Sequence, residues 1–423
     1  MLTIEQLKKD TAFTKERLAH KHFKEVHFVD EVIALDDKRK LVKSYLDDFL
    51  AQRNSLSKEI GILMKNGKRE EAETMKIKIA DIKENADKLE IEIAEIEASI
   101  YDKLVTMPNF PNAIVPAGKA AEDNEVVFSV AEFPTLPANA MPHWDLAKKY
   151  NLIDFELGNK ITGAGFPVYK GKGAALQRAL IAFFLDKAID AGYLEVQVPH
   201  VVNRDSGFGT GQLPDKEGQM YHITVDDLYL IPTAEVPITN IYRDEIVDEK
   251  ALPIKNVGYT PCFRREAGSY GKDVRGLNRL HQFDKVEIVR IEKPENSYIA
   301  LDEMLKHVEG LLKALELPYR ILRLCGGDMT FSSALTYDFE VYSTAQQRWL
   351  EVSSVSNFET FQANRLKLRI KDAENKKTLA HTLNGSALAL PRIMAGLLEN
   401  HQTAAGIRIP KALIPYTKFE LID

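Results

Sequence analysis

Along the first hundred residues, apolar side chains recur with a heptad period. Nine positions from Leu35 to Leu63 follow alternating spacings of four and three residues, and seven of them are apolar. After the segment KNGKREE, nine positions from Ala72 to Ile100 repeat the spacing, and all nine are apolar. Heptads of this kind are typical of helices packed along a narrow seam, so the pattern predicts an antiparallel coiled-coil hairpin. With a rise of about 1.5 Å per residue, this arm spans roughly 50 Å.

The helical period ends at Met107, and the chain then becomes rich in proline. Six prolines fall between Pro108 and Pro142, which indicates a linker and an extended entry into a second domain. We therefore expect an N-terminal helical domain over residues 1–106 and a second domain over residues 107–423.

The second domain opens with one long amphipathic segment. Residues 173–192 place Leu176, Leu180, Phe184 and Ala188 on one stripe of a helix. The run YLEVQVPHVV follows as a strand, and its proline indicates an edge or irregular position. An apolar helix and such an edge strand need cover, so this segment is expected to form the interface of a two-fold homodimer.

Several β-rich runs follow without a helix between each pair. They cover residues 220–236, 257–266, 281–291 and 337–356. The sheet should therefore be mainly antiparallel with helices on its outside, and the fold class is predicted to be α+β. Neither the P-loop nor the dinucleotide-binding glycine pattern occurs, so a bound nucleotide would need another kind of site.

Charge and cysteine content narrow the class of protein. The net charge of −6 over 423 residues argues against general affinity for polyanions, so any nucleic-acid contact must come from a local patch. The two cysteines have no metal or redox spacing, which suits a reducing compartment. With no apolar stretch of signal-peptide or membrane-span length, the sequence predicts a cytoplasmic protein without membrane contact.

One segment with unusual chemistry lies between two of the β-rich runs. Arg264 and Glu266 have the spacing that places side chains on one face of a strand, and Arg279, Phe283 and Glu287 do the same on the next strand. Guanidinium groups match phosphate oxygens, an aromatic ring suits a nucleobase, and carboxylates suit an amino group or Mg²⁺. We interpret the hairpin as an ATP site, and a surface salt-bridge ladder is the alternative.

The loop of this hairpin contains three glycines together with Lys272 and Arg275. It can close over the site.

Three motifs of the sequence resemble those of the class II aminoacyl-tRNA synthetases. FRREAG followed by RLHQFDKVE is similar to motif 2 of that class, VQVPHVV to the motif 1 strand, and NGSALALPRIMAGLLEN to motif 3. Four segments, in this order after a coiled-coil arm, resemble more specifically the seryl-tRNA synthetases of bacterial type. They are IPTAEVP, RGLNRLHQFDKVE, EVSSVSNFETFQANR and TLNGSALA. The resemblance covers essentially the whole chain and implies a class II catalytic domain after the arm.

The resemblance implies a division of roles among the ATP-binding residues. Arg264 would hold the α-phosphate together with the serine carboxylate, and Arg279 and Arg392 would hold the outer phosphates. Phe283 would stack on adenine while Glu266 recognises its edge. These three arginines are the residues that would act in catalysis.

Further positions of the ATP site follow from the same resemblance: Arg265, Val352 and Ser353. Glu351 and Ser354 would bind ATP and hold Mg²⁺ on the phosphates. Glu351 and Ser354 are three residues apart, so on a regular strand their side chains point to opposite faces. Both can reach one metal only if the strand ends or bulges at this point.

The resemblance also implies a serine pocket and a complete reaction. Serine would be enclosed, with Arg264, by six residues of three segments: Thr233, Ala234, Glu235, Glu287, Asn384 and Ser386. L-serine would react with ATP to form seryl-adenylate and would then be transferred to tRNA(Ser), and to tRNA(Sec) as well.

Cations cluster near the tip of the predicted arm. Charge alone favours a plain solvated coiled-coil surface, whereas the resemblance makes this cluster the tRNA contact. The residues concerned are Lys65, Lys68, Arg69, Lys76 and Lys78.

Three positions depart from the family pattern. Arg265 stands where serine is common and should point away from the ATP face. Pro391 replaces a glycine just before Arg392 and could alter the start of that helix. Val355 replaces a common cysteine, which is a packing change.

Two other classes of protein remain as alternatives. One is a ligase that charges a carrier protein instead of tRNA, although such relatives lack the long arm. The other is a non-catalytic coiled-coil scaffold with a synthetase-like domain.

Overall fold

The computed structural model describes residues 1–215, 217–266 and 275–423. The chain forms two compact units, Met1–Pro108 and Asn109–Asp423. Lys272, expected on the loop over the ATP site, lies outside the described residues, whereas Arg275 is the first described residue of the range 275–423.

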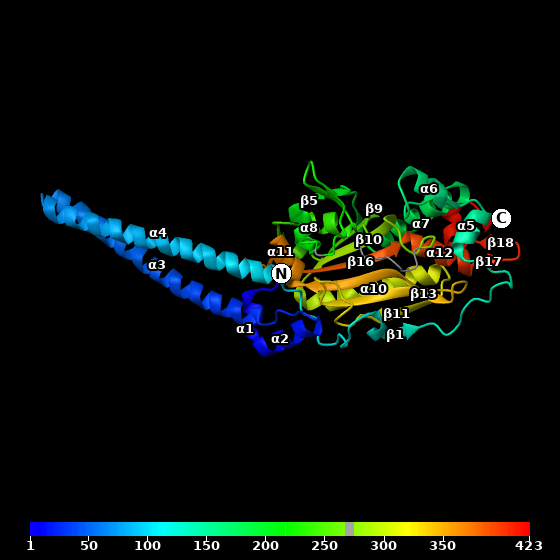
Figure 1. The fold of residues 1–423 in the computed structure, drawn as a ribbon, viewed down its shortest axis with the longest axis horizontal. Coiled ribbons are helices and arrows are strands. Elements are labelled where there is room, and N and C mark those ends of the chain that lie inside the picture. Colours follow the sequence, from blue (N-terminus) through cyan, green and yellow to red (C-terminus); the bar gives the residue numbers. More distant parts are fainter. Residues whose placement is uncertain (216, 267–274) are drawn as a thin grey trace. The chain divides into compact units, whose positions relative to one another are not determined.

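The first unit consists of four helices (Figure 1). Two short helices, α1 (Ile4–Lys9) and α2 (Thr11–His20), precede the two long helices α3 (Phe28–Lys65) and α4 (Arg69–Thr106). A capping box formed by Thr3 and Gln6 begins α1. The long helices pack against each other as the predicted antiparallel hairpin, so the arm is confirmed.

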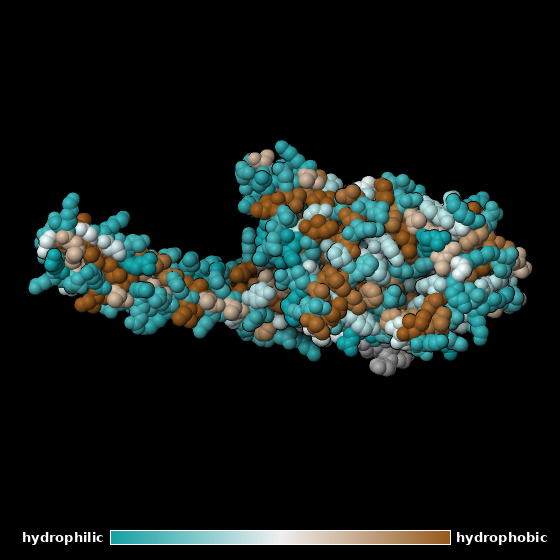
Figure 2. Space-filling view, turned by 90° about the horizontal axis from the view of Figure 1, so that it is seen from above, coloured by the Kyte–Doolittle hydropathy of each residue, from teal (hydrophilic) through white to brown (hydrophobic). Residues whose placement is uncertain are grey.

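The seams of α3 and α4 are the least exposed positions of the arm. Val42, Leu46, Ala86 and Ile96 are buried, whereas most residues between the seam positions are exposed, with buried Asp36 as an exception. Ion pairs between the helices, such as Arg39 with Glu97 at 3.3 Å, fit the antiparallel register. Hydrophilic and apolar patches alternate along the arm surface in Figure 2. The seam thus holds the hairpin together while its outer faces stay in solvent.

An eight-stranded sheet forms the centre of the second unit. Neighbouring strands are antiparallel except for the parallel pair β4 and β9, so the predicted α+β class and mainly antiparallel sheet are confirmed. In spatial order the strands are β1 (Glu125–Ser129), β11 (Tyr319–Arg323), β12 (Leu335–Ser343), β13 (Arg348–Glu359), β16 (His381–Ala389), β10 (Gln282–Glu292), β9 (Ile254–Phe263) and β4 (Leu194–Glu195).

Three long helices cover one face of this sheet. They are α7 (Gly171–Asp190), α10 (Ser297–Ala314) and α12 (Leu390–Asn400). Val286 and Ile288 of β10 belong to the hydrophobic core that these helices share with the sheet. Because side chains alternate along a strand, Lys285 and Glu287 point to the opposite face.

The remaining elements are short and surround the sheet. The helices are α5 (His143–Lys149), α6 (Phe155–Ile161), α8 (Arg204–Thr210), α9 (Glu235–Asn240), α11 (Thr360–Leu366) and α13 (Ile414–Thr417). The strands are β2 (Ile153–Asp154), β3 (Val168–Tyr169), β5 (Val201–Asn203), β6 (His222–Ile223), β7 (Leu228–Leu230), β8 (Ile246–Asp248), β14 (Arg369–Lys371), β15 (Lys377–Leu379), β17 (Gln402–Thr403), β18 (Gly406–Arg408) and β19 (Leu421–Ile422).

Two details of the predicted dimer segment differ from expectation. The single strand expected over residues 193–202 is two short strands, β4 and β5, with Pro199 between them. Proline has no N–H for a sheet ladder, which accounts for the interruption. The helical stripe that includes Leu176 and Phe184 is covered by the chain's own core, so it does not need a partner. Edge strand β4 keeps Leu194 66% exposed.

Both cysteines, Cys262 and Cys325, are buried free thiols, as expected for packed side chains. In the part of the chain that the structure describes, every helix is too short or too polar to cross a membrane.

Candidate active site

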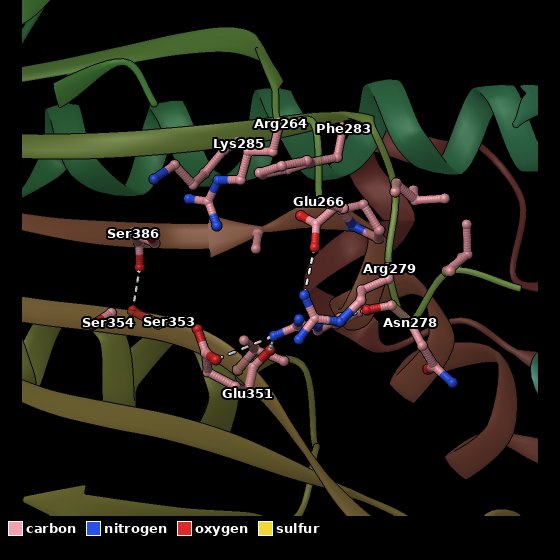
Figure 3. A pocket seen from close by; sticks show the side chains of 16 residues that line it. Arg264, Glu266, Asn278, Arg279, Phe283, Lys285, Glu351, Ser353, Ser354 and Ser386 are labelled. Carbon is pink, nitrogen blue, oxygen red and sulfur yellow. Dashed lines mark hydrogen bonds and ion pairs between the residues drawn. The ribbon is translucent and has the colours of Figure 1, made fainter. Parts of the chain in front are cut away.

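A pocket of about 210 Å³ opens on the face of the sheet away from α7 (Figure 3). Its walls come from the segment after β9, from residues 277–280 and the start of β10, from β13 and β16, and from the start of α12. Most of the predicted ATP-binding residues line it, together with two predicted serine-binding residues, Ser386 and Arg264, the second of which is predicted for both ligands: Arg264, Glu266, Arg279, Phe283, Glu351, Val352, Ser353, Ser354, Arg392 and Ser386.

Arg264 and Glu266 reach the pocket by a different route from the one predicted. Strand β9 ends at Phe263, and Glu266 has a φ of 50°, outside the range of a regular strand. The Arg264 N–H donates to the carbonyl of His281 at 2.9 Å, which ties the segment to the chain entering β10. The two side chains line the same pocket although strand alternation does not place them there.

Arg265 is the one predicted ATP-binding residue that does not line the pocket. It is exposed, its N–H donates to the carbonyl of Gln219 at 2.9 Å, and it is absent from the pocket lining. This agrees with the expectation that its side chain lies off the ATP face, and its part in ATP binding stays a prediction.

Each pocket arginine has a partner that fixes its position. Arg279 forms an ion pair with Glu266, and the guanidinium of Arg264 lies 5.2 Å from the ring centre of Phe283. Arg392 donates to the Glu351 carbonyl at 2.7 Å, and its NH1 lies 3.4 Å from the Glu351 carboxylate. The pocket is thus a pre-arranged, cation-rich surface suited to an anionic ligand.

A β-bulge in β13 decides on which face of the strand the two predicted metal ligands, Glu351 and Ser354, lie. Glu351 and Ser353 pair with neighbouring residues of β12, so Val352 is an extra residue in the strand. The bulge returns Glu351 and Ser354 to one face, where both line the pocket. Carboxylate and hydroxyl oxygens are ligands that Mg²⁺ accepts, so the pair fits the implied ion.

Pro391 does not disturb the placement of Arg392. It lies in the first turn of α12, where the helix needs no N–H from it and its fixed φ is suitable. Arg392 Nε donates to the carbonyl of Asn278 at 3.1 Å, and its side chain lines the pocket.

The predicted serine-binding residues form a buried cluster next to the pocket. Asn384 Nδ2 donates to Glu235 Oε2 at 2.8 Å and to Glu287 Oε1 at 3.0 Å. Ser386 donates to Glu287 Oε2 at 3.3 Å, and Thr233 lies just before α9, which begins with Glu235. Ala234, also predicted here, is fully buried at the N-terminal cap of α9. The structure therefore brings together three segments that are distant in sequence.

Two carboxylates in this cluster share a dry environment. Burial and the charge of nearby Glu287 raise the pKa of Glu235 to about 7. Hydrogen bonding to Gln362 and the charges of Lys285 and Arg264 act in the opposite direction. Glu235 is thus poised to change its protonation state when a cation arrives beside it.

Lys285, Gln362 and Asp338 are among the residues of this site that sequence reasoning missed. Lys285 lies between Phe283 and Glu287 with the same strand parity, so the alternation that selected its neighbours could have found it. Gln362 of α11 donates to Glu235 Oε1 at 2.7 Å, and no pattern in the sequence indicates this contact. On β12, burial and the charge of Glu351 raise the pKa of Asp338 well above its usual range.

The predicted tRNA-contacting residues all lie on the first unit and are exposed. Lys68 and Lys76 form ion pairs with Glu71 and Glu73, at 2.9 Å and 2.6 Å. The other three are Lys65, Arg69 and Lys78. Within the described residues, no ion pair joins these three to a carboxylate.

Comparison with known proteins defines the class first. A family model described as tRNA synthetase class II core domain (G, H, P, S and T) matches residues 221–401, which include every residue found to line the pocket. The second unit is therefore a class II aminoacyl-tRNA synthetase core. A model described as seryl-tRNA synthetase N-terminal domain matches residues 1–111. The chain belongs to the seryl-tRNA synthetase family.

Known relatives are similar to this chain over its full length. The chain is 51% identical to a serine–tRNA ligase of Salinibacter ruber, over 100% of this chain and 99% of that protein. It is 45% identical to a serine–tRNA ligase of Chlorobaculum parvum over 100% of both chains. A crystal structure of the seryl-tRNA synthetase of Pyrococcus horikoshii complexed with ATP superimposes with a TM-score of 0.94. It has 33% identity, and the match covers 100% of this chain and 99% of that one.

Proposed function

We propose that this chain activates L-serine with ATP to form seryl-adenylate and transfers the serine to tRNA(Ser). The observation that carries this proposal is the cation-rich pocket on one face of the sheet, directly adjoining the buried cluster of Glu235, Glu287 and Asn384. A nucleoside triphosphate in the pocket and an amino acid in the buried cluster would meet at Arg264.

The reaction needs positioning rather than a catalytic base. A carboxylate oxygen of serine attacks the α-phosphorus of ATP, a P–O bond forms to serine, and the bond to the leaving pyrophosphate breaks. The serine carboxylate is already ionised at neutral pH, so no proton has to be removed. Arg264 would hold the two reacting groups together, while Arg279 and Arg392 would offset the charge on the outer phosphates.

Recognition of the adenine would come from two residues of the hairpin. Phe283 offers a ring face, and Glu266 offers a carboxylate that can accept a hydrogen bond from the adenine amino group. Val352 and Ser353, at and after the bulge, line the pocket and would lie beside the phosphates.

Glu351 and Ser354 are the residues that would hold Mg²⁺. Within the described residues, no group of three or more acidic, histidine or cysteine side chains forms a metal site, so phosphate oxygens would have to complete the coordination. When bound, the ion would supply charge neutralisation on the triphosphate. Arg392, which contacts Glu351, would keep that carboxylate in place.

The buried cluster suits serine better than its near relatives. A buried carboxylate that accepts the serine hydroxyl would be left without a partner by alanine, which makes discrimination strong. Threonine would have to be excluded by the lack of room for its methyl group. Thr233, Glu235, Glu287, Asn384 and Ser386 are the residues proposed for this recognition.

Transfer to tRNA would depend on the first unit. Lys65, Arg69 and Lys78 are exposed, and a projecting arm suits the shape-based recognition of RNA helices. Replacing these three by Gln should leave adenylate formation unchanged and raise the KM for tRNA(Ser). It should also flatten the dependence of tRNA binding on salt. The same arm is proposed to serve tRNA(Sec) as a second substrate.

Replacement of Lys43, Lys83 and Lys88, three exposed lysines nearer the base, provides the control, although Lys88 differs from the tip residues in pairing with Glu84 at 2.7 Å. Equal losses from the two triple variants would remove the specific role of the tip. Unchanged charging by both would assign the arm another function.

The chain is further proposed to act as a cytoplasmic homodimer. Its exposed edge strand β4 offers a sheet edge that a second copy can cover. Light scattering at micromolar concentration tests this, and a monomer would contradict it.

Pyrophosphate exchange into ATP, measured with each of the twenty amino acids, tests the central proposal. We expect exchange with serine, dependent on Mg²⁺, and much slower exchange with threonine and alanine. Equal turnover of threonine would contradict the serine assignment. Transfer to tRNA rather than to a carrier protein is supported by the N-terminal family match over residues 1–111.

A further inference from the structure

Lys285 is a charged residue of the pocket to which the roles above assign nothing. Its side chain is 6% exposed, and its Nζ lies 2.6 Å from Glu287 Oε2. Nζ also donates to Thr233 Oγ1 at 2.8 Å. Lys285 lines the pocket, as Phe283 does, two residues along β10, and Figure 3 shows both side chains on the same side of that strand. Its ammonium group therefore occupies two acceptors proposed for serine.

The net charge of the buried cluster around Glu235 and Glu287 is zero only when Lys285 is counted. Glu235 and Glu287 are buried carboxylates, and Arg264 and Lys285 are the cations whose fields act on Glu235. Two positive and two negative groups give zero net charge when all four are ionised, and a bound ammonium group favours the ionised form of Glu235. Buried charge is costly unless it is compensated, so this balance matters for whichever ligand enters.

We propose that Lys285 is a specificity-determining residue of the serine pocket, because its fixed charge makes the compartment neutral and so selects a zwitterion over a cation. The inference rests on the proposed function. Serine carries one positive and one negative group at neutral pH and adds no net charge. An amino alcohol adds one positive charge, and its ammonium meets Lys285 at Thr233 and Glu287 without a carboxylate to offset the repulsion.

Two neutral replacements separate charge from positioning. Lys285→Gln keeps hydrogen-bond donors for Thr233 and Glu287 but removes the charge, whereas Lys285→Met removes both. Lys285→Arg keeps the charge. Titration calorimetry at pH 7.5 would measure the dissociation constants of L-serine and of 2-amino-1,3-propanediol, the cation in which a hydroxymethyl group replaces the carboxylate.

The expected result is a change in selectivity shared by both neutral variants. In Lys285→Gln and Lys285→Met, the preference for serine over the amino alcohol should fall at least about tenfold, because a full charge acts within a few ångströms in a dry site. Lys285→Arg should keep the preference. Lys293→Gln is the matched control, since Lys293 follows the end of β10 and pairs with Glu249 at 2.7 Å.

The possible outcomes are distinguishable. An unchanged preference in Lys285→Gln would overturn the inference, because Lys285 would then act only by positioning its neighbours. If Lys285→Met fails to fold, Lys285→Gln alone decides. A wild-type protein that binds no serine would overturn the proposed function and the inference with it. A wild-type protein that binds serine, with the same preference in every variant, would overturn only the role of Lys285.

Discussion

The Nε2 atom of His143 accepts a hydrogen bond from the backbone N–H of Leu277, with 2.8 Å between the two nitrogens. Because Nε2 accepts, the proton of a neutral ring lies on Nδ1, which is 2.6 Å from Glu399 Oε1. Both side chains are fully buried. A Cβ on Gly276 would lie 2.2 Å from His143 Nε2, so only glycine fits before Leu277. The pair anchors the chain where it enters the ATP pocket.

His143→Ala should therefore weaken ATP binding as well as stability. The Leu277 N–H loses its buried acceptor, which costs about 1–3 kcal/mol of unfolding free energy, and Asn278 and Arg279 lose their fixed position. We expect the KM for ATP in the exchange reaction to rise about tenfold. His401→Ala is the control, because His401 is buried against the Leu315 carbonyl and should affect thermal unfolding alone. A KM that rises equally in both variants would contradict the anchoring role.

Arg264→Ala and the neighbouring Arg265→Ser should have opposite outcomes. Loss of a charged donor aimed at developing phosphate charge costs about 3 kcal/mol or more, so Arg264→Ala should reduce exchange by more than about a hundredfold. Arg265 is exposed and outside the pocket, so its replacement should change the rate by less than about threefold. Exchange rates at saturating serine measure both. Reversed effects would show that the ATP face has been misassigned.

Serine binding should release protons near neutral pH. The pKa of Glu235 is raised to about 7 by burial and by Glu287, and an incoming ammonium group favours its ionised form. The bound state thus has a lower pKa, and serine affinity should rise as the pH goes from about 5.5 to 7.5. Calorimetry at pH 6.5 in two buffers of different ionisation enthalpy measures the release. A Glu235→Gln variant should release fewer protons, and zero release by the wild type would contradict the proposal.

Acid should loosen the base of the arm. Burial alone would raise the pKa of Asp36, but hydrogen bonds from Lys40, Lys8 and Arg39 outweigh it and lower the pKa well below its usual range. A carboxyl group with a lowered native pKa contributes stability above its unfolded pKa and loses it as the pH falls through the native value.

Asp36→Asn should consequently lower the free energy of unfolding of the first unit by about 1–3 kcal/mol at pH 7. The difference from wild type should shrink as the pH falls below about 4. Circular dichroism of thermal unfolding at several pH values measures it, with Asp37→Asn as control because Asp37 is 65% exposed. A difference that is constant with pH would exclude the titration of Asp36.

The sequence was sufficient to predict the structure wherever a hydrophobic period repeats over many residues. Nine seam positions per helix over-determine the arm, and alternation along β10 places Phe283 and Glu287 on one face. Local irregularity limits the same reasoning. Arg264 and Glu266 share the pocket because the backbone turns at a φ of 50°, and a two-residue period contains no sign of that turn. Gln362 reaches Glu235 through tertiary packing of α11, which no local pattern encodes.

Because Val352 is an extra residue in β13, the placement of the active-site residues depends on the number of residues in that strand. Substitutions in β13 leave its alternation intact, whereas deletion of one residue would reverse the face of everything on one side of it. Either Glu351 or Ser354 would then turn toward the hydrophobic core. This segment can therefore diverge by replacement but not by single insertions or deletions. Among descendants of a common ancestor, its length should be the slowest feature to change.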